Sequence, residues 1–138
     1  MKKKLSLMFT SAALLLMMIV TLCACSSYGS VKKTFEKEGW TENEKLVEMQ
    51  DALLTEMLGE DYDSACTVHA LGKDGTLLNY VIILEFSSTE EMEKQIQESD
   101  TLKGMIKDLQ NSDYVSGNCV LAFFTPMGGG NEVFKSTK

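Results

Sequence analysis

The chain has 138 residues, which is enough for one domain with its own hydrophobic core. It carries 13 lysines, no arginine and 20 acidic residues, so its formal net charge is −7 at neutral pH. Nucleic-acid binding requires a basic surface that releases counterions, and this charge excludes that class of function. The charge also argues against electrostatic attraction of the whole domain to anionic lipid head groups.

The amino-terminal segment has the layout of a secretory signal. Residues 2–4 are lysines, residues 5–22 are uncharged and mostly apolar, and the small residue Ala24 stands directly before Cys25. A positive start, an apolar run and a small residue before the cleavage point are the three parts of a signal peptide. The pattern therefore predicts export from the cytoplasm.

The last four residues of this segment, Leu22, Cys23, Ala24 and Cys25, resemble the lipobox of bacterial lipoprotein precursors. That motif reads Leu, a tolerant position, Ala or Gly, and then the modified Cys; Cys23 is an unusual occupant of the tolerant position. The resemblance implies diacylglycerol on the Cys25 thiol, cleavage between Ala24 and Cys25, and often an acyl group on the new amino terminus. It implies a protein anchored by lipid in the cell membrane on its extracytoplasmic side, because two acyl chains give stable attachment.

An uncleaved transmembrane helix is the alternative interpretation of the same segment. The apolar run over residues 5–22 is near the lower limit of about 17 residues for a membrane span. The small residue followed by Cys25 favours the lipoprotein. Both interpretations put the rest of the chain outside the cytoplasm.

Cys66 and Cys119 are the cysteines that are left once Cys25 carries lipid. Outside the cytoplasm, such a pair is a disulfide candidate. The alternative is two small buried thiols that behave as ordinary core residues. The sequence leaves both open, because the bond requires the two Cα atoms to lie within about 7 Å of each other.

The chain after the signal is typical of a single domain. We expect a signal peptide over residues 1–24, a flexible tether over 25–30, one folded domain over 31–135 and a frayed tail over 136–138. Two helices open the domain, a short one over 31–38 that Gly39 ends and a longer one over 41–58 that Thr41 caps and Gly59 ends. Apolar residues recur at helical spacing along the longer helix, which indicates a face that packs on the core.

Asp74-Gly75 predicts a two-residue hairpin turn between strands over residues 65–73 and 76–86. Both turn residues tolerate the positive φ that such a turn requires. In the register that this turn sets, His69 stands opposite Tyr80. We therefore expect a half-buried His69 that packs against Tyr80.

The second strand of this hairpin is apolar on both sides. Residues 80–84 and Phe86 are apolar, and Glu85 alone is charged. Such a run is typical of a central strand that is covered on both faces. Helices of the same chain or a second copy of the chain would supply that cover, so a homodimer is one expectation.

Two more helices and a last strand complete the pattern. We expect helices over 88–98, where Ser88 and Glu91 have capping-box spacing, and over 101–110, and then a strand over 118–124. Residues 132–134 are a candidate for a short edge strand. The order α-α-β-β-α-α-β predicts an α+β domain with a mainly antiparallel sheet of three or four strands and helices packed on it.

No constellation of catalytic or metal-binding residues stands out. His69 is the only histidine, and the nearest nucleophile candidates, Ser64 and Cys66, share its strand without converging on it. Zinc needs three or four ligands, which one histidine and two separated cysteines do not supply. The acidic run 60–63 lacks the glycine and closing glutamate of a calcium loop. The glycine-rich loop 127–131 precedes no helical pattern, so it predicts neither a phosphate site nor a bound cofactor.

These features together predict a membrane-anchored extracytoplasmic lipoprotein whose domain is a non-catalytic binding module for an unidentified protein, peptide or small molecule. One alternative is an accessory subunit of an envelope process such as transport or cell-wall assembly, where tethering raises the local concentration. A second alternative is a small envelope enzyme that uses His69 or a reactive Cys66. The fold class does not choose between them, because small α+β domains host many functions.

Overall fold

The computed structural model describes residues 27–75 and 77–138. The lipobox residues Leu22, Cys23, Ala24 and Cys25 lie outside the described residues, as does the rest of the expected signal peptide. Ser27, the first described residue, is two positions after the cysteine that we expect to carry lipid.

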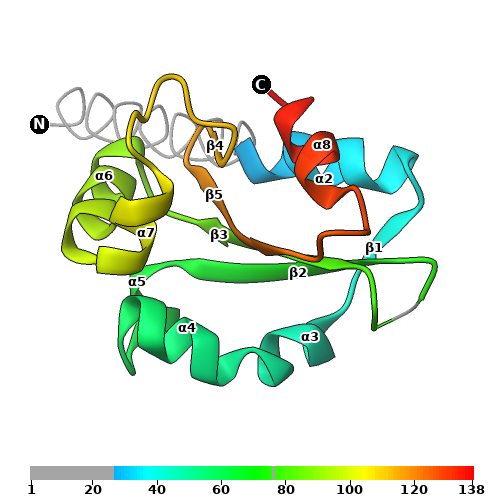
Figure 1. The fold of residues 1–138 in the computed structure, drawn as a ribbon, viewed down its shortest axis with the longest axis horizontal. Coiled ribbons are helices and arrows are strands. Elements are labelled where there is room, and N and C mark those ends of the chain that lie inside the picture. Colours follow the sequence, from blue (N-terminus) through cyan, green and yellow to red (C-terminus); the bar gives the residue numbers. More distant parts are fainter. Residues whose placement is uncertain (1–26, 76) are drawn as a thin grey trace, which may run out of the picture.

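The fold is a five-stranded antiparallel sheet with the strand order β1-β2-β3-β5-β4 and helices on both faces (Figure 1). The strands are β1 (Trp40–Glu42), β2 (Thr67–Lys73), β3 (Tyr80–Glu85), β4 (Val115–Ser116) and β5 (Cys119–Phe124). The helices are α2 (Ser27–Lys37), α3 (Glu44–Met49), α4 (Asp51–Leu58), α5 (Tyr62–Ala65), α6 (Thr89–Glu98), α7 (Asp100–Met105) and α8 (Gly130–Lys135). The α+β class and the antiparallel sheet are confirmed, and the short strands β1 and β4 extend the sheet at its two edges.

The central strand β3 is buried on both faces, as its apolar sequence predicts. The face that includes Ile82 and Leu84 packs under α3, α4, α6 and α7. The face that includes Val81 and Ile83 packs under α2 and α8, which lie together on one side of the sheet, opposite α3 and α4 (Figure 1). Helices of the same chain thus supply the cover for which a second copy had been one candidate.

The hairpin register differs from the predicted one by three residues. Asp74 and Gly75 do adopt positive φ, but the Lys73 N–H donates to the Asn79 carbonyl and closes a longer loop. His69 therefore stands opposite Ile83, not opposite Tyr80. An odd shift moves every side chain of the second strand to the other face of the sheet.

The first helix begins earlier than predicted. Ser27 to Ser30 were expected in a flexible tether, but they form the first turn of α2, because Tyr28 gives that turn a side chain to bury. The single helix expected over 41–58 is two helices, α3 and α4, which meet at Gln50. It also starts later than predicted, since Thr41 belongs to β1 and the side chain of Asn43 caps α3 at the Lys45 N–H. Because α2 begins at Ser27, a single residue separates the expected lipid site at Cys25 from the folded body.

The carboxyl-terminal segment is also more ordered than its sequence indicates. The candidate edge strand over 132–134 is part of α8, which buries Phe134 completely. Thr137 lies in the expected frayed tail, yet its hydroxyl donates to the hydroxyl of Ser116, over 2.9 Å. A buried aromatic residue and a side-chain hydrogen bond thus hold this end of the chain against the sheet.

Candidate functional site

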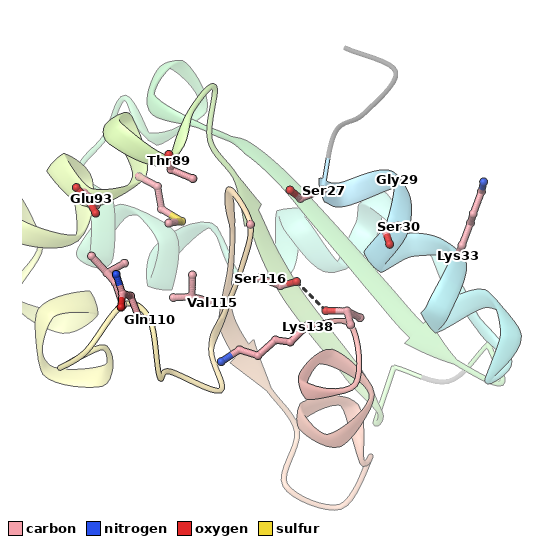
Figure 2. A pocket seen from close by; sticks show the side chains of 14 residues that line it. Ser27, Gly29, Ser30, Lys33, Thr89, Glu93, Gln110, Val115, Ser116 and Lys138 are labelled. Carbon is pink, nitrogen blue, oxygen red and sulfur yellow. Dashed lines mark hydrogen bonds between the residues drawn. The ribbon is translucent and has the colours of Figure 1, made fainter. Parts of the chain in front are cut away.

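An open groove of about 1010 Å³ lies at the β4 edge of the sheet (Figure 2). Its walls come from the first turns of α2, the first half of α6, the loop before β4, β4 itself and the residues after α8. The lining residues are Ser27, Gly29, Ser30, Lys33, Thr89, Met92, Glu93, Leu109, Gln110, Val115, Ser116, Gly117, Thr137 and Lys138. Ligand sites in proteins are concave, and here apolar side chains of Met92, Leu109 and Val115 stand among a majority of polar lining residues.

The turn between β4 and β5 sets the position of α2 beside the groove. Gly117 has a φ of +60°, and a Cβ on it would lie 1.9 Å from the Ser27 Oγ. The same Ser27 oxygen accepts a hydrogen bond from the Asn118 N–H, over 3.4 Å. Only glycine allows this approach, because a side chain would both collide with Ser27 and strain the backbone. The first residue of α2 is thereby fixed to the sheet.

The groove lining differs in charge from the chain as a whole. Lys33 and Lys138 are its basic residues and Glu93 is its acidic one, whereas the chain has an acidic excess. Among the described residues, neither lysine has a carboxylate within 4.0 Å. Lys33 projects from the α2 side, and Lys138 extends toward the side that holds Gln110 and Glu93 (Figure 2). Hydroxyl groups and three apolar side chains complete the lining.

His69 lies outside this groove, in a polar cluster between the sheet and α2. Its ring stacks on that of Tyr28 with a centroid separation of 3.5 Å. Its Nε2 lies 3.0 Å from a Glu85 oxygen, and its Nδ1 lies 3.8 Å from a Glu42 oxygen. His69 is half-buried as expected, but its aromatic partner is Tyr28, because the register shift takes Tyr80 to the opposite face.

The hydroxyl of Tyr28 also contributes to this cluster, since it donates a hydrogen bond to Glu42. That bond is the main cause of the lowered pKa of Glu42, and Lys32, 3.3 Å away, adds to it. Burial, followed by the bond to Glu42, raises the pKa of Tyr28. Within the described residues the contacts of His69 are with Tyr28, Glu42 and Glu85, so the cluster presents a base without an adjacent nucleophile and fastens α2 to the sheet.

Of the two possibilities that the sequence leaves open for Cys66 and Cys119, the structure has the pair of buried thiols and not the disulfide. Both thiols are free and buried. Cys66 belongs to the core under α4 and α6, and Cys119 to the core under α2 and α8, so the sheet separates them. Burial raises the pKa of the Cys66 thiol to about 11 and that of the Cys119 thiol to about 12. A raised pKa keeps both groups as thiols at neutral pH, which argues against Cys66 as a nucleophile.

The glycine-rich loop has a packing role. Gly129 and Gly130 lead into α8, contrary to the expectation that no helix follows. A Cβ on Gly130 would lie 2.2 Å from the Val81 Cγ1 and 3.1 Å from Trp40. The small residue therefore lets the helix approach the sheet closely. Across residues 27–75 and 77–138, we find no group of three or more His, Cys, Asp or Glu side chains placed to hold a metal ion.

Exposed apolar side chains gather at the opposite end of the sheet. Leu77, Leu78 and Met127 are the members of this apolar tip, with exposed fractions of 50%, 80% and 93%. The loops that carry them are neighbours, because a Cβ on Gly128 would lie 3.4 Å from the Asn79 side chain. Surface patches of this kind mark contact sites when several members lie together.

No protein-family model, no curated protein and no solved structure matches this chain. Within the described part of the chain, every helix is too short or too polar to cross a bilayer. The candidate site therefore depends on the geometry of the groove alone. Sequence reasoning missed the groove because four separate segments form it, and none of them carries a motif.

Proposed function

We propose that the chain is a lipid-anchored extracytoplasmic lipoprotein whose domain is a non-catalytic binding module, with the groove as its ligand site. The lipobox residues Leu22, Cys23, Ala24 and Cys25 support the anchor. The observation that carries the binding function is the groove itself, which combines about 1010 Å³ of open space with a lining of polar residues that includes two lysines and one glutamate.

The intact mass of protein extracted from membranes tests the anchor. We expect the mass of residues 25–138 plus diacylglycerol, with or without an added acyl chain, and no change on reduction because both thiols are free. The Cys25→Ala chain should keep its precursor mass and lose the lipid. A wild-type protein that stays in the membrane at its precursor mass would identify the uncleaved helix instead.

Native mass spectrometry of the extracted, lipid-anchored protein tests the ligand site. We expect a non-covalently bound mass in the wild type and its loss in Ser30→Trp, because an indole at this exposed groove position would fill the space. Ala52→Trp is the matched control, since Ala52 is exposed on α4 and does not line the groove. Equal retention of the ligand in both variants would exclude the groove.

An accessory subunit of an envelope complex is the second candidate, and the apolar tip favours it. Leu77, Leu78 and Met127 form the kind of patch that a protein partner covers. Cross-linking in membranes should then capture a partner with the wild type and lose it with Leu78→Glu. An enzyme that uses His69 or Cys66 has less support, because His69 contacts no nucleophile among the described residues and Cys66 is buried with a raised pKa.

A further inference from the structure

The connection between the expected lipid and the folded body is too short to act as a free tether. One residue, at position 26, separates Cys25 from Ser27, the first residue of α2. Even fully extended, two residue steps span about 7 Å. Ser27 also lines the groove, so one wall of the groove lies within about 7 Å of the lipid-bearing Cα at most.

α2 is held firmly on the sheet, so its first residue, and with it the attachment point of the lipid-bearing segment, keeps a fixed place on the folded body. Tyr28, Val31 and Phe35 bury one side of the helix, with exposed fractions of 7%, 1% and 0%. The helix runs from Gly117 at its start to the hairpin loop at its end, where Gly39 approaches Asp74. Eleven residues of helix span about 16 Å, so the apolar tip lies at the far end from the lipid.

The lining of the groove fits the polar head of a phospholipid. Lys138 extends toward the side that holds Gln110 and Glu93, so its ammonium group would donate to a phosphate and the Glu93 carboxylate would accept from an amine. Lys33 adds a second positive charge on the α2 side of the groove. This local excess of basic residues stands in a chain of net negative charge. Binding to a head group then does not require electrostatic attraction of the whole acidic domain to the membrane. The lipid anchor brings the groove to the head groups, and the contacts form inside the groove.

We propose that the lipid on Cys25 holds the domain with the groove turned toward the bilayer, and that the ligand of the groove is the phosphate-bearing head group of a lipid in the same membrane. This inference rests on the proposed lipid anchor and assigns a ligand class to the proposed site. It leaves the apolar tip directed away from the bilayer surface.

Site-specific fluorescence on the processed, lipid-anchored protein in nanodiscs tests the orientation. Gln110→Cys places a dye in the groove and Met127→Cys places one on the tip; the two native thiols are buried, with raised pKa values that limit competing labelling. Nitroxides on the lipid head groups should quench the dye at position 110 several-fold more than the dye at position 127. Equal quenching, or stronger quenching at position 127, would overturn the orientation.

Native mass spectrometry of the same nanodisc samples tests the ligand. A Lys33→Glu, Lys138→Glu double variant should lose bound phospholipid several-fold relative to the wild type. A Lys45→Glu, Lys103→Glu double variant makes the same charge change at exposed positions outside the groove and should retain it. Equal loss in both double variants would overturn the head-group assignment.

The outcomes separate this inference from the function on which it rests. A protein without lipid on Cys25 would remove the anchor and the orientation that depends on it, and the groove would remain a candidate ligand site. A lipid-anchored protein whose groove holds a ligand that is not a phospholipid would keep the binding module and overturn the head-group assignment alone.

Discussion

The two faces of the sheet are covered in different ways. The face that contains Leu84 packs against helices from the middle of the chain, residues 44–105, and its core is apolar almost throughout. The face that contains Ile83 packs against α2 and α8, which come from the two ends of the described chain. This second face includes a cluster of ionisable side chains, formed around His69.

The difference shows how one sheet can combine a continuous core with an attachment surface. The helices from the middle of the chain form one layer, in which segments close together in the sequence pack side by side. The opposite layer joins distant segments, and its first helix leads directly to the expected lipid site. We therefore expect substitutions on the α2 face to loosen the attachment of α2 to the sheet. We also expect substitutions at its polar cluster to change how stability depends on pH.

The largest expected loss of stability comes from substitution of two adjacent residues of β3, one on each face of the sheet. Ile83 and Leu84 are both fully buried, on opposite faces. Replacement of either by alanine should lower the free energy of unfolding by about 2–5 kcal/mol, because each leaves a cavity. Urea denaturation measures both, with Leu78→Ala as the exposed control that should change stability by less than about 0.5 kcal/mol. A cost below about 1 kcal/mol for Ile83→Ala would mean that α2 and α8 cover their face only loosely.

The next effect concerns the contact between α2 and the sheet. Gly117→Ala should lower the free energy of unfolding by about 2–3 kcal/mol, because the added Cβ collides with Ser27 at a positive φ. Gly104→Ala is the matched control, since Gly104 lies in α7 with open space around its Cβ position and should gain about 0.5 kcal/mol. Thermal unfolding measures both. A neutral Gly117→Ala would show that the first turn of α2 is free to move.

A smaller effect tests the layer formed by the middle of the chain. Ser99 is buried, caps α7 at the Leu102 N–H and donates to the Met57 carbonyl over 2.6 Å. Ser99→Ala should cost about 1–2 kcal/mol. Ser88→Ala removes the cap of α6 at an exposed position and should cost less, because it breaks one bond and leaves no buried group unpaired. Equal costs would mean that the bond to Met57 contributes nothing to stability.

The smallest effect is a pH dependence on the α2 face. The pKa of Glu42 lies below its ordinary value of 4.5, chiefly because Tyr28 donates to it. A lowered pKa in the folded state adds stability above pH 4.5 that is lost as the pH falls through the folded value. Tyr28→Phe keeps the ring stack but removes the donor, so its stability should fall less steeply in acid than that of the wild type.

Urea midpoints measured across the acidic range would check this prediction. Glu42→Gln should show the same reduced slope, because it removes the titrating group. Glu56→Gln, at an exposed position on α4, should keep the wild-type slope. The effect is small because 40% of the Glu42 side chain is exposed and solvent screens its interactions.

Local patterns in the sequence predicted the parts of the fold that depend on neighbouring residues. The two-sided apolar run of β3 and the cap of α6 by Ser88 are confirmed. The hairpin register was wrong because burial of residues 80–84 outweighs the tight turn that Asp74-Gly75 favours locally. The partners of His69 and the walls of the groove come from segments far apart in the chain, and no spacing rule relates such segments.

The position of α8 has a consequence for synthesis and export. The chain is made from its amino end, so all five strands emerge before the helix that contributes Phe134 to the core. Until then, the face of the sheet that holds Val81, Ile83 and Leu121 lacks part of its cover. A nascent chain at this stage exposes apolar surface and is prone to aggregation, so we expect chaperones to engage it until α8 has emerged.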